Sequence, residues 1–126
     1  MPNDCPQIDS QHLQTIDHEQ LTPKLPLEQP AKILLLYGSL RERSYSRLVT
    51  EECTRLLDFF GVETKTFNPS GLPLPDDADA DHPKVVELRE LVNWSDGMIW
   101  CSPERHGAMT SIMKARLDWI PLSLGG

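Results

Sequence analysis

Apolar and polar residues follow one another in blocks that predict strand and helix in turn. Residues 32–37 carry an apolar run after Lys32 and are followed by Gly38, which is typical of a strand buried on both faces. Residues 44–60 then show the 3.6-residue period of a helix, which Gly61 closes. Residues 62–67 alternate as a more exposed strand does. The side chains that keep the helical period make up its apolar side: Val49, Cys53, Leu56, Leu57 and Phe60.

The second half of the chain repeats this alternation after a long break. Residues 68–82 are rich in proline and aspartate, so we expect a loop there. A helix is expected over residues 83–93, because the proline at its start suits the first helical turn. A short apolar strand over residues 96–101 follows, then a loop through Gly107, and a helical pattern resumes over residues 109–120.

Alternating strands and helices predict the α/β class, here a flavodoxin-like three-layer sandwich with a parallel sheet and right-handed crossovers. Such sheets contain about five strands, whereas this sequence supplies only strands one to three. Strand three would lie at an open edge with Ile99 and Trp100, and an exposed apolar edge promotes aggregation. We therefore expect this sequence to be the N-terminal part of a longer protein, or a truncated copy of one.

Residues 1–30 differ from the rest, since prolines at positions 2, 6, 23, 26 and 30 limit the length of any element and apolar residues are sparse. Two readings remain open: a disordered tail, or an extended arm that orders against a partner subunit. Leu21, Leu25 and Leu27 favour the arm, because they give it something to bury. The predicted organisation is thus an arm followed by one domain over residues 31–126.

Charge and cysteine content narrow the possible functions. Lys and Arg number 12 and Asp and Glu 19, so the net charge is −7, which argues against nucleic-acid binding. No apolar run approaches the roughly 18 residues that a membrane span needs, and no basic leader is present. The 3 cysteines form no CxxC pair, so a reduced, cytoplasmic setting is expected.

The loop after the first strand, Gly38–Arg47, is the first candidate for chemistry. Ligands of doubly wound sheets bind at the carboxyl ends of strands, where a helix N-terminus attracts anions. Hydroxyls at Ser39, Ser44 and Ser46 and the guanidinium of Arg41 suit a phosphate group. The Walker and dinucleotide glycine motifs are both missing. A purely structural alternative stays open, with Ser44 as helix N-cap and the arginines as a solvated face.

The loop after the third strand, residues 102–107, is the second candidate. In the strand order 2-1-3-4-5 the first and third strands are neighbours, so the two loops would flank one cleft. Pro103 and Gly107 loosen this loop, and its backbone can meet a flat ring. The structural alternative makes His106 an exposed histidine and Glu104–Arg105 a surface pair.

Both loops resemble those of the NADPH-dependent FMN reductase family. Its first loop reads approximately GSxRxxSxxR, matched by residues 38–47, and its second reads PEYN or PEYxG, matched by residues 103–107. The following helix ends in Asp-Trp in the family, as at Asp118–Trp119 here. Arg-His in place of Tyr-Asn resembles the ArsH subgroup of arsenical resistance flavoproteins.

The resemblance implies FMN as cofactor and NADPH as hydride donor. Ser39, Arg41, Ser44 and Ser46 would hold the FMN phosphate, and Asp118–Trp119 would stabilise packing. The second loop would surround the ring mainly through its backbone, with these residues: Pro103, Glu104, Arg105, His106 and Gly107. No catalytic side chain is expected, since the ring carries the hydride.

The resemblance further implies an oxidoreductase that forms homodimers or homotetramers and reduces a small-molecule acceptor. Oxygen, quinones, azo compounds, metal ions and trivalent organoarsenicals are the acceptor classes. Two other functions remain open, a flavodoxin-like electron carrier and an inactive fragment that keeps only assembly contacts. No metal site is expected, because Cys53 and Cys101 fit core positions, and the acidic run at residues 76–81 lacks the pattern of a calcium loop.

Overall fold

The computed structural model describes residues 17–21 and 28–124. Their centre is a parallel sheet of three strands ordered β2-β1-β3, which confirms the predicted order of the first three strands. The strands are β1 (Lys32–Tyr37), β2 (Glu63–Phe67) and β3 (Gly97–Cys101). Thus the continuous apolar run became the central strand, and its four last residues are at most 6% exposed.

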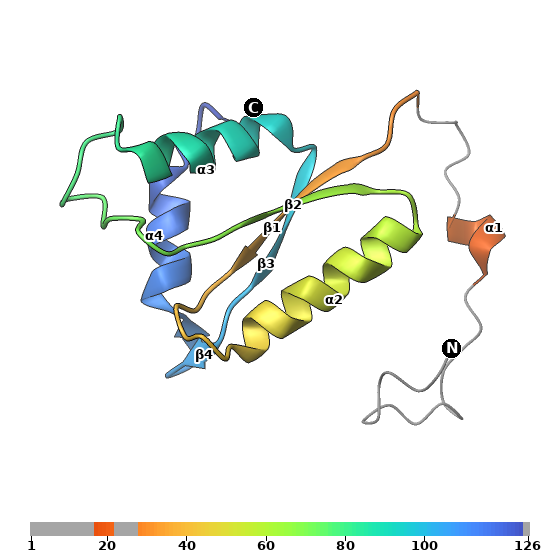
Figure 1. Ribbon diagram of the computed structural model, residues 1–126, viewed down its shortest axis with the longest axis horizontal. Helices are drawn as coiled ribbons and strands as arrows, with labels where there is room; N and C mark the ends of the chain where they lie inside the picture. The colour runs from red at the N-terminus through yellow and green to blue at the C-terminus, as the bar shows by residue number, and fades with distance from the viewer. Residues whose placement is uncertain (1–16, 22–27, 125–126) are drawn as a thin grey trace.

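Helices cover both faces of this sheet (Figure 1). Helix α2 (Tyr45–Phe59) lies on one face, and α3 (Pro83–Trp94) and α4 (Ser111–Trp119) lie on the other. A single turn, α1 (His18–Leu21), is capped by the Asp17 carboxylate and falls within the predicted arm. Residues 1–16 and 22–27 of that arm lie outside the described residues. In the part of the chain that the structure describes, no helix is long and apolar enough to cross a membrane.

The main core fills the space between the sheet and helices α3 and α4. One alternating set of strand residues, Leu34, Leu36 and Phe67, is wholly buried there. The core residues that the two helices contribute are Val85, Leu88, Val92, Met113 and Trp119. The indole nitrogen of Trp119 donates to the carbonyl of Pro73 at 2.7 Å, which ties the long loop to the core. This confirms packing as the role of Trp119.

The other face of the sheet differs from the prediction. Of the residues expected on the packed side of α2, Val49, Leu56 and Phe60 are exposed by 53%, 42% and 49%. Ser46 and Thr50 are buried instead. The expectation was wrong for these three residues, whereas Cys53 and Leu57 are half-buried. Thr50 can be buried because its hydroxyl donates to the Ser46 carbonyl at 2.8 Å, which satisfies its polarity inside the helix.

The loop expected through Gly107 is a small hairpin, and this is a second correction. Strands β4 (Glu104–Arg105) and β5 (Ala108–Met109) pair antiparallel. The two turn residues, His106 and Gly107, have φ of 53° and 80°, the positive values that a two-residue type I′ turn requires. The next helix therefore begins at Ser111 rather than at residue 109.

Candidate functional site

The two candidate loops leave the sheet side by side. Strands β1 and β3 pair in parallel up to Tyr37 opposite Cys101. The Gly38 amide extends this pairing by donating to the Cys101 carbonyl at 2.8 Å. Both segments of the chain then turn away from the sheet at the same edge, where β1 and β3 end. The prediction that the loops flank one cleft is confirmed.

The first loop is folded by its own serines. The Ser39 hydroxyl accepts the Arg41 amide at 3.2 Å, and the Ser44 hydroxyl caps α2 by accepting the Arg47 amide at 3.2 Å. Ser44 and Ser46 share a hydroxyl–hydroxyl bond of 3.0 Å and are both buried. The capping role of Ser44 is therefore real. Ser44 also marks the N-terminus of α2, whose first N–H groups have no acceptor within the helix.

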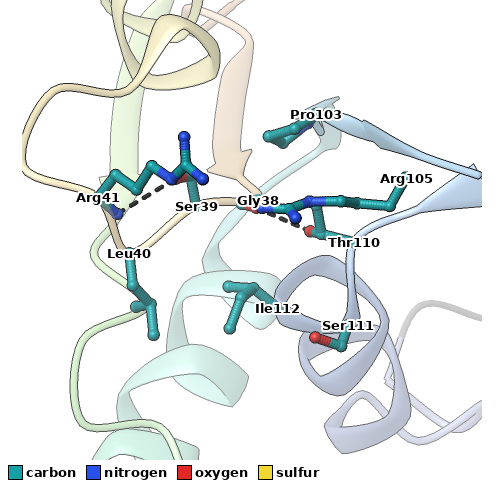
Figure 2. A pocket seen from close by; sticks show the side chains of 9 residues that line it. All are labelled: Gly38, Ser39, Leu40, Arg41, Pro103, Arg105, Thr110, Ser111 and Ile112. Atoms are coloured by element: carbon teal, nitrogen blue, oxygen red, sulfur yellow. Dashed lines mark hydrogen bonds between the residues drawn. The ribbon is translucent and has the colours of Figure 1, made fainter.

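A cavity of about 630 Å³ opens between the two loops (Figure 2). Ser39 and Arg41 border it on the side of the first loop, and Arg105 extends across it from the hairpin. Its other lining residues are Gly38, Leu40, Pro103, Thr110, Ser111 and Ile112. The volume lies in the range of roughly 300–1,000 Å³ that small-molecule sites occupy.

A second cavity of about 370 Å³ adjoins the first, since Ser39, Arg41, Pro103 and Arg105 line both. The buried pair of serines at the start of α2 belongs to this second cavity. Six of the predicted site residues thus surround one continuous region: Ser39, Arg41, Ser44, Ser46, Pro103 and Arg105.

The region is rich in positive charge. Arg41, Arg43 and Arg105 all line the second cavity, and none forms an ion pair with another described residue. The chain as a whole carries a net charge of −7. A concentration of guanidinium groups at one edge of an acidic protein favours an anionic ligand.

The other predicted residues of the second loop shape the hairpin. Glu104, His106 and Gly107 are exposed and line neither of the two cavities described above. The Glu104 carboxylate accepts the Gly107 amide across the turn. These three residues therefore fix the conformation of the hairpin, whose strand β4 carries Arg105.

Sequence reasoning missed the residues that join the loops. Thr110 is 6% exposed, caps α4 by accepting the Met113 amide at 3.2 Å, and reaches the first loop. A hydroxyl residue directly before a helical pattern is an N-cap signal. Placing the helix start at residue 109 concealed that signal.

The two described cysteines differ in their relation to the site, because Cys101 lines the second cavity whereas Cys53 lines neither cavity. Cys53 and Cys101 are half-buried thiols between α2 and β3. Burial raises the pKa of the Cys101 thiol, and a hydrogen bond with Thr50 opposes that rise. Cys5 lies outside the described residues. Among the residues that the structure describes, no group of three or more potential metal ligands comes together.

Comparison with known proteins decides the family. The model of the NADPH-dependent FMN reductase family matches residues 31–125, which include both loops. The chain belongs to this family.

Members of the FMN reductase family that are similar to this chain are about twice as long. "NADPH-dependent FMN reductase ArsH" of Acidithiobacillus ferrooxidans is 58% identical over 125 residues, which are 99% of this chain and 53% of that protein. The protein of the same name from Rhizobium meliloti is 60% identical over 98% of this chain and 51% of its own length. The chain thus spans about half the length of these relatives.

The family's fold is seen in solved structures as well. The flavoenzyme NAD(P)H:(acceptor) oxidoreductase FerB of Paracoccus denitrificans superimposes with a TM-score of 0.64 at 24% identity. The match covers 75% of this chain and 54% of FerB. At this level of identity the likeness concerns the fold alone, and it confirms the flavodoxin-like class.

Proposed function

We propose that this chain forms the FMN-binding part of an NADPH-dependent FMN reductase. The observation that carries the proposal is the meeting of the two family loops at a cavity whose arginines form no ion pair with another described residue. The first loop would hold the phosphate of FMN, and Pro103 with the hairpin would border its ring.

The donors at the first loop fit a phosphate. The α2 N-terminus offers backbone N–H groups, and Arg41 adds a charged donor beside them. Ser39 lines the same space, and the Ser44–Ser46 pair has one hydroxyl proton that their mutual bond leaves free. Together these groups would bind a dianion without a metal ion.

When bound, FMN would supply hydride and electron transfer between NADPH and an acceptor. The side chains of this chain would then bind, orient and shield it. Leu40 and Ile112 face one another across the larger cavity (Figure 2) and give it an apolar wall. No side chain needs to act as a general acid or nucleophile in this scheme.

The choice of acceptor and the assembly are part of the same proposal. Relatives at 29–30% identity include an "NADPH azoreductase" of a Bacillus species and a "2-hydroxy-1,4-benzoquinone reductase" of a Burkholderia species. Their names support azo compounds and quinones as acceptor classes. The resemblance to the ArsH subgroup adds trivalent organoarsenicals as a further proposed acceptor class. We further propose a cytoplasmic homodimer or homotetramer, for which chromatography with light scattering is the test.

Binding of FMN by the purified chain tests the proposal directly. Calorimetry with FMN should show saturable uptake, and adding NADPH without oxygen should bleach the flavin absorbance. Saturable uptake without bleaching would indicate an electron carrier rather than a reductase. A folded chain that takes up no FMN would contradict the proposal.

Arg41→Ala separates the phosphate contact from general folding. Loss of a charged hydrogen bond should weaken FMN binding by about tenfold to a hundredfold and reduce its dependence on salt. Arg55→Ala is the matched control, because Arg55 lies on α2 in an exposed ion pair with Glu52. Equal affinities in the two variants would remove Arg41 from the proposed site.

A further inference from the structure

We propose that Thr110 and Ser102 are positioning residues that set the spacing between the two loops of the site. The inference rests on the proposed function, since the loops matter because FMN would lie between them. Neither hydroxyl was singled out by the family motifs. Both belong to a hydrogen-bonded cluster with Gly38, and the three residues are called here the loop clasp.

Thr110 forms the centre of the loop clasp. Its hydroxyl donates to the Gly38 carbonyl at 2.7 Å and accepts the Met113 amide at 3.2 Å. One side chain therefore caps α4 and anchors the first residue after β1, 72 positions earlier in the chain. Because Thr110 is 6% exposed, water does not compete freely for these bonds.

Ser102 completes the loop clasp from the other strand. Its hydroxyl accepts the Thr110 amide at 3.0 Å and lies 2.9 Å from the Pro103 carbonyl, to which it donates. The two hydroxyl oxygens are 3.3 Å apart. Each hydroxyl thus accepts one backbone N–H near the start of α4 and donates to the carbonyl of a residue at the site.

Gly38 is the third member because the cluster leaves no room for a side chain. A β-carbon at this position would lie 2.8 Å from the Thr110 hydroxyl oxygen and 2.9 Å from that of Ser102. The backbone of the first loop can approach the second this closely only with glycine. The glycine is therefore explained by its neighbours rather than by contact with a ligand.

The loop clasp acts on the geometry of the cavity. Gly38, Pro103 and Thr110 all line the 630 Å³ cavity, and Ser39 follows directly on Gly38. Releasing the clasp would let the phosphate side and the ring side of the cavity move independently. A site that must hold both ends of one ligand loses affinity when its halves are no longer held in register.

Thr110→Val is the decisive variant, since valine keeps the shape and removes the hydroxyl. We expect about tenfold weaker FMN binding, the cost of about one hydrogen bond. In the FMN-free chain we expect faster hydrogen exchange at the amides of residues 38–44 and 104–110, by a larger factor than in the central strand, which responds only to the lost cap of α4. Thr110→Ser, which restores the hydroxyl, should recover both properties.

Thr54→Val is the matched control. The Thr54 hydroxyl donates to the Thr50 carbonyl at 3.1 Å within α2 and touches neither loop. It removes a comparable hydroxyl bond, and we expect unchanged FMN affinity and unchanged exchange in both loops. Ser102→Ala gives a second test in case Thr110→Val does not fold, with the same direction of change as that variant.

The outcomes separate the two proposals. If the unaltered chain takes up no FMN, the proposed function fails, while loop exchange in the FMN-free variants still decides the clasp. Unchanged exchange and unchanged affinity in Thr110→Val and Ser102→Ala would overturn the clasp. So would faster loop exchange of equal size in Thr54→Val, because the effect would then be one of general stability.

Discussion

Helices α2 and α4 begin at the same edge of the sheet with a hydroxyl cap, yet α2 buries small hydroxyl-bearing side chains whereas α4 buries large ones. Helix α2 buries Ser46 and Thr50 against the sheet and exposes Tyr45 by 74%. Helix α4 buries Met113 and Trp119, at 1% and 6% exposure. An apolar periodicity therefore shows that a helix forms, but not which of its sides packs on the sheet.

The two caps differ in the same way. Ser44 bonds within its own helix, to the Arg47 amide and to Ser46. Thr110 bonds to its own helix and also to Gly38 on the neighbouring loop. One cap therefore leaves its loop free to meet a ligand, and the other anchors both loops. Substitutions in α2 and in α4 test this contrast between the two helices.

The largest expected effect comes from truncating the packed side of α4. Met113→Ala should lower the free energy of unfolding by about 3 kcal/mol, because it leaves a cavity in the core. Leu48→Ala removes a similar side chain from α2, which is 51% exposed, and should change that free energy by less than about 0.5 kcal/mol. Urea unfolding of both variants measures the difference, and equal losses would contradict the assignment of faces.

The second prediction is a gain in the free energy of unfolding rather than a loss, and it concerns Arg116 in the last turn of α4. This side chain is fully buried, and none of its guanidinium nitrogens has a hydrogen-bond partner among the described residues. Its guanidinium carbon lies 5.5 Å from the centroid of the Tyr37 ring and 5.7 Å from that of the Phe67 ring, which gives it two cation–π contacts. Arg116→Met should therefore raise the free energy of unfolding by about 1–2 kcal/mol.

The pH dependence of the stability gained in Arg116→Met tests whether the buried charge causes it. Burial lowers the pKa of Arg116 from its ordinary value to about 10, so the folded chain disfavours the charged form. The penalty is complete below pH 10 and is relieved as the pH rises from there towards the ordinary pKa of arginine, because the folded chain then loses the charge while the unfolded chain keeps it. The gap between Arg116→Met and the unaltered chain should be constant from about pH 6 to 9 and narrow above 10. A gap that widens above pH 10 would exclude a buried charge as the source.

The smallest effect is expected at the cap of α2. Ser44→Ala should cost about 1 kcal/mol of stability without any ligand, since the Arg47 amide loses its acceptor. Ser44→Asp keeps a capping oxygen and should retain that stability while repelling a bound phosphate. Thermal unfolding with and without FMN distinguishes the two roles. Equal stabilisation of Ser44→Asp and the unaltered chain by FMN would place the phosphate elsewhere.

Strong local signals explain what could be predicted. The apolar run at residues 32–37 matched β1 residue for residue, and Gly61 and Pro83 marked helix ends correctly. The parallel order followed from alternation of strand and helix, and it brought the two loops together. These features depend on neighbours in the sequence or on general rules of chain topology.

What could not be predicted depends on contacts between distant residues. The bond from Thr110 to Gly38 spans 72 positions, and nothing near either residue announces it. Thr50 faces the sheet because the Ser46 carbonyl satisfies its hydroxyl, a detail that the hydrophobic pattern does not record. Nothing in the helical pattern over residues 109–120 distinguishes Arg116, although the fold buries its side chain completely.

The turn at the tip of the hairpin explains a choice of residue by backbone shape. At position 106 φ is 53°, where asparagine, aspartate, histidine and glycine are tolerated far better than branched side chains. The family pattern commonly carries asparagine at this place, and this chain carries His106. Histidine therefore preserves the left-handed backbone conformation at this position. Across the family we expect residue types that tolerate a positive φ here, whatever the chemistry of their side chains.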